Sequence, residues 1–229
     1  MIRAGGTDMG SGIADLEARY RALRPDLPEI LRLRIHRALS WCRRAEREGD
    51  DPDARFIFYW IAFNAAYADD VVDAESARMP ERSRFEDYFA KIVRRDGGRA
   101  IYDAIWQRFA QSIRVLLGNR YVFQPFWHHH NGLAGHADWE DRFARSQQKV
   151  QAALARQDTH FILSVLFDRL YVLRNQLIHG GATWNSSVNR EQVKDGARIL
   201  EFLLPLFLEI MMNHPDENWG NPHYPVVSA

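Results

Sequence analysis

Apolar residues recur at helical spacing along most of this sequence. Residues 99–117 carry them on one stripe, whereas residues 55–67 are apolar nearly all round, which is typical of a helix buried on every side. No useful length of chain alternates apolar and polar residues as a half-buried strand does. The pattern therefore predicts an all-α fold built as a helical bundle.

Capping and stop signals set the bounds of the predicted helices. Asp51 followed by Pro52 favours a helix start, because aspartate accepts hydrogen bonds at an N-cap and proline suits the first turn. Gly180 and Gly181 favour a sharp stop after a long apolar helix. The predicted helices cover residues 13–23, 28–48, 52–67, 83–95, 99–117, 138–155, 159–179 and 190–213.

The length and composition of the chain predict one large domain. Its 229 residues, 46% of them hydrophobic, are enough to bury a sizeable core. We expect residues 1–12 to form a flexible tail, residues 13–213 a single helical domain, and residues 214–229 an irregular C-terminal tail. Residues 120–137 are expected to be the least regular internal stretch, packed on the body through their aromatic side chains.

The charges of the chain balance, with 30 basic and 30 acidic residues, so contact with a nucleic acid requires a local patch. One candidate patch is an arginine-rich face of the helix predicted over residues 28–48. This face carries Arg32, Arg34, Arg37, Arg43, Arg44 and Arg47. Such a run is typical either of a solvated helix face or of an RNA-facing stripe, and the solvated face is the favoured interpretation.

The location of the protein is predicted from its cysteine usage and its apolar segments. Cys42 is the only cysteine, so no internal disulfide framework is possible. Residues 1–12 lack the apolar core of a signal peptide, and residues 199–212 are interrupted by charges and a proline. These features predict a cytoplasmic protein with no membrane span.

Candidate chemistry is concentrated at the end of the apolar helix predicted over residues 159–179. On a helix, Asn175 and His179 lie about 40° apart around the axis, and Arg174 and His179 about 140° apart, which a long arginine side chain can bridge. Histidine can exchange a proton with a ribose 2′-hydroxyl, and arginine can hold a phosphate. One histidine supplies half of an acid and base pair, so we expect a second copy of the chain to complete the site across a two-fold axis.

Two of these residues also allow a purely structural interpretation. Arg174 can form a surface salt bridge, and His179 can cap the C-terminus of its helix, where a cation interacts favourably with the helix dipole. Asn64 is the polar exception in the apolar segment 55–67. A buried amide needs hydrogen-bond partners, so Asn64 either ties its helix to a neighbour, which is the favoured interpretation, or reaches a functional site.

The spacing Arg174-Asn175-(three residues)-His179 resembles the motif of the HEPN superfamily of ribonucleases and nucleotide-binding helical domains. The earlier segment Trp60-Ile61-Ala62-Phe63-Asn64 adds to the resemblance, which covers residues 28–68 and 159–213. Residues 83–155 would then be a helical insertion into the HEPN-like bundle.

The resemblance implies a dimer that cleaves RNA through the 2′-hydroxyl without a metal or cofactor. Arg174 and His179 would be catalytic, Asn175 would support them, and Asn64 would be a secondary site residue. The superfamily also has members that bind without cleaving.

A rival site is the run His128, His129 and His130 with His136 and Asp138. Imidazoles and a carboxylate suit a divalent metal ion, but adjacent residues seldom point the same way, so a packed or exposed loop is favoured and no metal site is predicted.

The sequence and this resemblance together predict an RNA-cleaving homodimer of a toxin–antitoxin or antiviral defence system, with an antitoxin or another protein as partner. The alternative is a non-catalytic module that binds a nucleotide, RNA or a partner protein.

Overall fold

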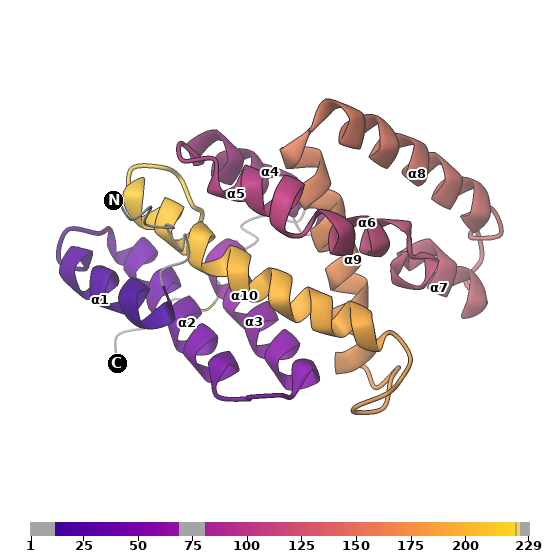
Figure 1. Cartoon of the computed structure of the whole chain (residues 1–229), viewed down its shortest axis with the longest axis horizontal. Helices are drawn as coiled ribbons and strands as arrows, with labels where there is room; N and C mark the ends of the chain where they lie inside the picture. Colours follow the sequence, from indigo (N-terminus) through magenta and orange to yellow (C-terminus); the bar gives the residue numbers. More distant parts are fainter. Residues whose placement is uncertain (1–11, 69–80, 223, 225–229) are drawn as a thin grey trace, which may run out of the picture.

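The computed structural model describes residues 12–68, 81–222 and 224, and its regular elements in these ranges are all helical (Figure 1). The all-α prediction is therefore confirmed. The helices are α1 (Ile13–Leu23), α2 (Glu29–Glu46), α3 (Pro52–Tyr67), α4 (Glu81–Arg95), α5 (Ala100–Asp103), a π-helical turn (Ala104–Arg108), α6 (Ala110–Gly118), a 3₁₀ turn (Arg120–Val122), α7 (Gln124–His130), α8 (Trp139–Arg156), α9 (Thr159–Ile178) and α10 (Arg190–Asn213). The tail predicted over residues 1–12 lies outside the described residues except for Gly12.

Helix α10 runs across the middle of the molecule, with α1–α3 on one side and α5–α8 on the other (Figure 1). Helix α3 packs on both α2 and α10, and α9 packs on α4. The N-terminus of α3 lies where the sequence predicts, because the Asp51 side chain accepts hydrogen bonds from the backbone N–H groups of Asp53 and Ala54 at 3.0 and 3.1 Å. The long apolar helices thus form the interior.

An aromatic cluster joins α3, α4 and α9. The ring of Phe63 lies 4.4 Å from that of Phe167, and Phe167 lies 4.7 Å from Phe89, measured between centroids. All three side chains are fully buried. Helix α4 falls within the range 83–155 that the sequence assigns to an insertion, and Phe85 and Phe89 place it in the shared hydrophobic core.

Helix α10 packs tightly against α3 and α9 at Gly196. A Cβ atom at this position would lie 2.8 Å from Cε2 of Phe56 and 3.1 Å from Cδ2 of Leu170. The absence of a side chain therefore lets three buried helices meet at one point.

Two stretches differ from the sequence prediction. The helix expected over residues 99–117 is interrupted by the π-helical turn 104–108, after which Phe109 leaves helical geometry with ψ of 13°. In the stretch expected to be irregular, α7 forms over residues 124–130, with Pro125 in its first turn and Phe126 packed against Trp139. The apolar residues of α7 are aromatic and clustered, and they do not recur at helical spacing. The apolar pattern therefore did not predict this helix.

Arg34 corrects the predicted solvated face of α2. Its side chain is fully buried, and its guanidinium donates hydrogen bonds to the backbone carbonyls of Ala65, Ala66 and Gly220. Arg34 therefore joins α2 to the end of α3 and to the chain that follows α10. Other members of the face, such as Arg43, which pairs with Glu17 at 3.1 Å, are used in surface salt bridges.

The segment after α10 has no helix among residues 214–222, as predicted, but it packs on the body. Trp219 is buried and donates its indole N–H to the carbonyl of His214 at 2.9 Å. Glu217 pairs with Arg94 and Arg95 of α4, and these two arginines lower the pKa of Glu217, although its partial burial acts in the opposite direction. In the described part of the chain, no helix has the length and apolarity needed to cross a bilayer.

The close approach at Gly196 generates a stability prediction. Gly196→Ala should lower the free energy of unfolding by about 1–3 kcal/mol, because the added methyl group must displace the ring of Phe56 in a packed core. Gly118→Ala is the matched control, since a Cβ at that helical position meets nothing within 4 Å. Urea denaturation measures both. Equal stability of the Gly196 variant and the wild type would contradict this account of the helix crossing.

Candidate functional site

Helix α9 carries the predicted motif from the core to the surface. Its start is fixed by Asp158, whose side chain accepts a hydrogen bond from the backbone N–H of Phe161 at 3.0 Å. Leu173 is buried, Arg174 and Asn175 are half-buried, and His179 is exposed. The motif residues therefore emerge at the edge of the core, as the apolar pattern indicates.

The end of α9 is set by its glycines. The backbone N–H of His179 bonds to the carbonyl of Asn175 at 3.0 Å, so His179 is the C-cap residue. Gly180 follows with a φ of 68°, a left-handed conformation that glycine adopts without steric cost. The chain then turns away, which confirms the predicted helix stop.

Arg174 and Asn175 form a hydrogen-bonded pair. Nη1 of Arg174 donates to Oδ1 of Asn175 at 2.9 Å, while Nε of Arg174 is buried and has no hydrogen-bond partner within the described ranges. No salt bridge to Arg174 is found among these residues, so its guanidinium charge is not neutralised by a carboxylate there. The arrangement differs from the surface salt bridge considered from the sequence.

The side chain of His179 is exposed and is not part of this hydrogen-bonded pair. Among the described residues it forms no hydrogen bond with Arg174 or Asn175, although the backbone of His179 continues the helix from Asn175. A single chain thus joins the guanidinium of Arg174 to the amide of Asn175, and leaves the imidazole of His179 exposed at the end of the same helix.

Asn64 does not lie near the end of α9 that carries Arg174 and His179. Trp60 contacts Tyr171 and Phe63 contacts Phe167, so α3 and α9 run in opposite directions. The first turn of α3, and not Asn64 in its last turn, therefore lies toward the end of α9 that carries the motif. The Asn64 side chain is half-buried and is not part of the cleft described next.

A cleft of about 910 Å³ opens beside the end of α9. Its walls come from the segment between α6 and α8, from the end of α9, and from the connection to α10. The lining residues are Asn119, Tyr121, Gln124, Trp127, Asn131, Val172, Asn175, Gln176, Gly181, Ala182, Thr183, Ser186, Val188, Asn189 and Gln192. Asn175 lines the cleft, whereas Arg174 and His179 do not, and this described lining contains no carboxylate, lysine, arginine or histidine.

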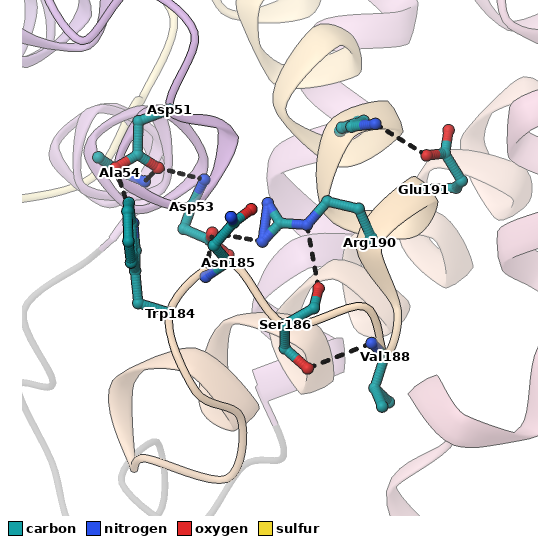
Figure 2. Close-up of polar contacts among 10 residues, drawn as sticks. Asp51, Asp53, Ala54, Trp184, Asn185, Ser186, Val188, Arg190 and Glu191 are labelled. Atoms are coloured by element: carbon teal, nitrogen blue, oxygen red, sulfur yellow. Dashed lines mark hydrogen bonds and ion pairs between the residues drawn. The ribbon is translucent and has the colours of Figure 1, made fainter.

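The connection between α9 and α10 is held against the first turn of α3 (Figure 2). The indole N–H of Trp184 donates to Oδ2 of Asp51 at 2.9 Å, and the backbone N–H of Asn185 donates to Oδ2 of Asp53 at 3.2 Å. Arg190, at the start of α10, pairs with the same carboxylate of Asp53 at 2.5 Å. These contacts fix the wall of the cleft that is formed by the connection.

The Asp51 carboxylate is stabilised by its hydrogen bonds. Partial burial acts to raise its pKa, but donation from the backbone of Ala54, the indole of Trp184 and the backbone of Asp53 outweighs burial and lowers the pKa. Asp51 therefore serves two purposes, as the N-cap of α3 and as the acceptor for the α9–α10 connection.

The histidine run does not converge on a common point. His128 packs on His136 with ring centroids 4.5 Å apart, and Nε2 of His128 lies 2.9 Å from Nε2 of Gln124. His129 and His130 are exposed. Within the described ranges, no three or more histidine, cysteine or acidic side chains are grouped to hold a metal ion.

Most of the amides that line the cleft were not identified from the sequence. They come from two stretches, residues 119–131 and 175–192, which are distant along the chain and have no motif spacing. The available signal was compositional: each stretch holds several asparagines and glutamines next to an aromatic or a glycine-rich turn. Only the fold shows that the two stretches face each other.

Removal of the shared acceptor at Asp51 generates a second prediction. Asp51→Ala should lower the free energy of unfolding by about 0.5–2 kcal/mol at neutral pH, because the α3 N-cap is lost. Since the pKa of Asp51 is lower in the folded state, this contribution is present above about pH 4 and disappears as the pH falls through the folded-state pKa. Chemical denaturation at several pH values measures it, with Asp50→Ala, an exposed neighbour, as the control. A pH-independent difference would contradict the assignment.

A third prediction concerns the packed pair of His128 and His136. Burial, with a smaller effect of His136, lowers the pKa of His128, so the folded state favours the neutral ring. Protonation should then favour unfolding, and the stability should fall as the pH drops below about 6.5, the ordinary value for histidine, until the folded-state pKa is passed. His128→Gln should remove this part of the dependence, and His129→Gln should retain it. NMR titration of the His128 ring reports the pKa directly, and a value at or above 6.5 would refute the prediction.

Comparison of the chain with protein-family models, with curated proteins and with solved structures finds no match.

Proposed function

We propose that the chain is a metal-independent endoribonuclease of the HEPN type, acting at a composite site formed by a homodimer. The observation that carries the proposal is the pair of Arg174 and Asn175 at the end of α9. A half-buried guanidinium there is oriented by an amide and has no carboxylate partner among the described residues. Such a group is suited to bind a phosphate, because the charge is available and its direction is fixed.

The proposed reaction begins with proton transfer from an RNA 2′-hydroxyl to the imidazole of His179. The 2′-oxygen attacks the adjacent phosphorus, the bond from phosphorus to the 5′-oxygen breaks, and a 2′,3′-cyclic phosphate forms. The departing 5′-oxygen takes a proton from the imidazolium of His179 of a second copy. Arg174 stabilises the negative charge that builds on the non-bridging oxygens.

A second copy enters the proposal because each chain offers one exposed imidazole beside the Arg174 pair. Two-fold symmetry would place two arginines and two histidines in a shared cleft and so provide both the acid and the base. Asn175 would be a positioning residue, since its contact is with Arg174. A place in a toxin–antitoxin or antiviral system, with an antitoxin as protein partner, belongs to the same proposal and rests on the family resemblance of the motif.

A non-catalytic binding module is the second candidate. It is favoured by the neutral cleft, which includes Asn175 but neither Arg174 nor His179. In that case the cleft would bind its ligand without turnover, and Arg174 would add affinity for a phosphate at its edge.

Variants of the motif separate these candidates. In the presence of EDTA, wild-type protein should cleave RNA, and His179→Ala should reduce the rate by about 10²–10⁴-fold through loss of acid–base catalysis. Arg174→Ala should reduce it by about 10²–10³-fold, because the charge on the phosphate is no longer stabilised. Gel assays with labelled RNA measure the rates, and thermal unfolding checks that each variant folds. His130→Ala, at an exposed histidine outside the site, should cleave normally. Undiminished cleavage by His179→Ala would rule out the proposed mechanism.

A further inference from the structure

We infer that the cleft beside α9 is a base-binding subsite, which takes up one unpaired nucleobase of an RNA strand whose phosphate lies at Arg174. The inference rests on the proposed function for its choice of RNA as the ligand. It assigns to the cleft a role distinct from cleavage, since neither Arg174 nor His179 is among the residues that line it.

The charge of the cleft fits a base better than a phosphate, and its volume leaves ample room for a base. A volume of about 910 Å³ lies in the range of ligand sites, which is roughly 300–1,000 Å³. No charged side chain lines it in the described part of the chain, so an anion inside would lack a counter-charge. Arg174 lies just outside, joined to the lining residue Asn175 by the 2.9 Å hydrogen bond. A nucleotide matches this arrangement, because its base is neutral, like the cleft, and its phosphate is anionic and would pair with the cationic Arg174.

Some amides of the lining are already committed to the fold. Gln176 donates to the carbonyl of Tyr121 at 2.7 Å and accepts from Asn189 at 3.0 Å, so it joins the two walls of the cleft. These contacts hold the walls at a fixed separation without a ligand, and little ordering is then required when a base enters.

Other amides remain available to a ligand. The side chains of Asn131 and Gln192 have no hydrogen-bond partner among the described residues, and the amide nitrogen of Asn175 is not used by its contact with Arg174. Carboxamides offer a donor and an acceptor side by side, which is the pattern needed to pair with the edge of a base. Three amides from three segments therefore provide groups that distinguish one base from another.

Trp127 provides an aromatic surface in the wall of the cleft that is formed by residues 119–131. Its indole N–H donates to the carbonyl of Tyr121 at 2.7 Å, which fixes the ring, and the side chain is half-buried. Tyr121 lines the cleft as well and is 43% exposed, with the guanidinium of Arg120 5.2 Å from its ring centroid. Unpaired bases are commonly recognised by stacking on aromatic rings combined with hydrogen bonds to their edges.

The test uses His179→Ala protein, so that RNA stays intact, and fluorescence anisotropy with short labelled homopolymers of each of the four bases. We expect one base to bind most tightly. In this background Trp127→Leu should weaken that oligonucleotide by about 5- to 100-fold, in line with the usual effect of losing one base stack. Gln192→Ala should reduce the preference among the four bases. Trp41→Leu and Gln111→Ala are controls, since neither residue lines the cleft.

An oligonucleotide with abasic positions completes the design. It retains the phosphates, so it should bind Trp127→Leu and its parent equally. If Trp127→Leu weakens the binding of base-containing and abasic strands equally, the inference is overturned and the ligand is ribose or another group. An absence of measurable RNA binding would also overturn it. Cleavage by wild-type protein is measured separately. If the wild-type protein cleaves RNA and the cleft variants have no effect on binding, only the base-binding subsite is contradicted. If binding is base-selective but no cleavage occurs, only the proposed nuclease activity is contradicted.

Discussion

The burial of α9 between α3 and α4 is the constraint on which the candidate site depends. Phe167 lies in van der Waals range of Phe63 and Phe89, and this packing fixes the axis and rotation of the whole helix. Since Leu173 is still in the core and Arg174 is not, the rotation decides which side chains emerge at the end. The glycine stop then determines that α9 ends at Ile178 and that His179 is its C-cap residue.

The second support of the site comes from the start of α3. The carboxylates of Asp51 and Asp53 lie at a helix N-terminus, where a negative charge is favourable, and both accept hydrogen bonds from the connection after α9. One buried helix thus presents the motif, and the antiparallel neighbour holds the wall of the cleft next to it. The motif and the cleft are coupled through Asn175, which contacts Arg174 and lines the cavity.

The sequence predicted those features that depend only on residues close together in the chain, such as helix caps and helix stops. The cap at Asp51 and the stop at Gly180 depend on a few neighbouring residues, and each lies where the sequence placed it. Arg34 was misjudged as part of a solvated face, because its partners include a carbonyl 186 residues away in the chain. Most of the amides of the cleft were missed for the same reason: Gln176 and Tyr121 meet only after α9 has packed. Sequence spacing could identify the motif but could not supply its surroundings.

In the proposed mechanism, RNA is cleaved by its own 2′-hydroxyl without a metal ion. The most direct measurement compares an RNA with the same sequence carrying 2′-O-methyl groups, both incubated with purified protein in EDTA. This mechanism predicts cleavage of the unmodified RNA alone, with 2′,3′-cyclic phosphate and 5′-hydroxyl ends. Cleavage of the methylated strand, or intact RNA at protein concentrations where the dimer is formed, would contradict it.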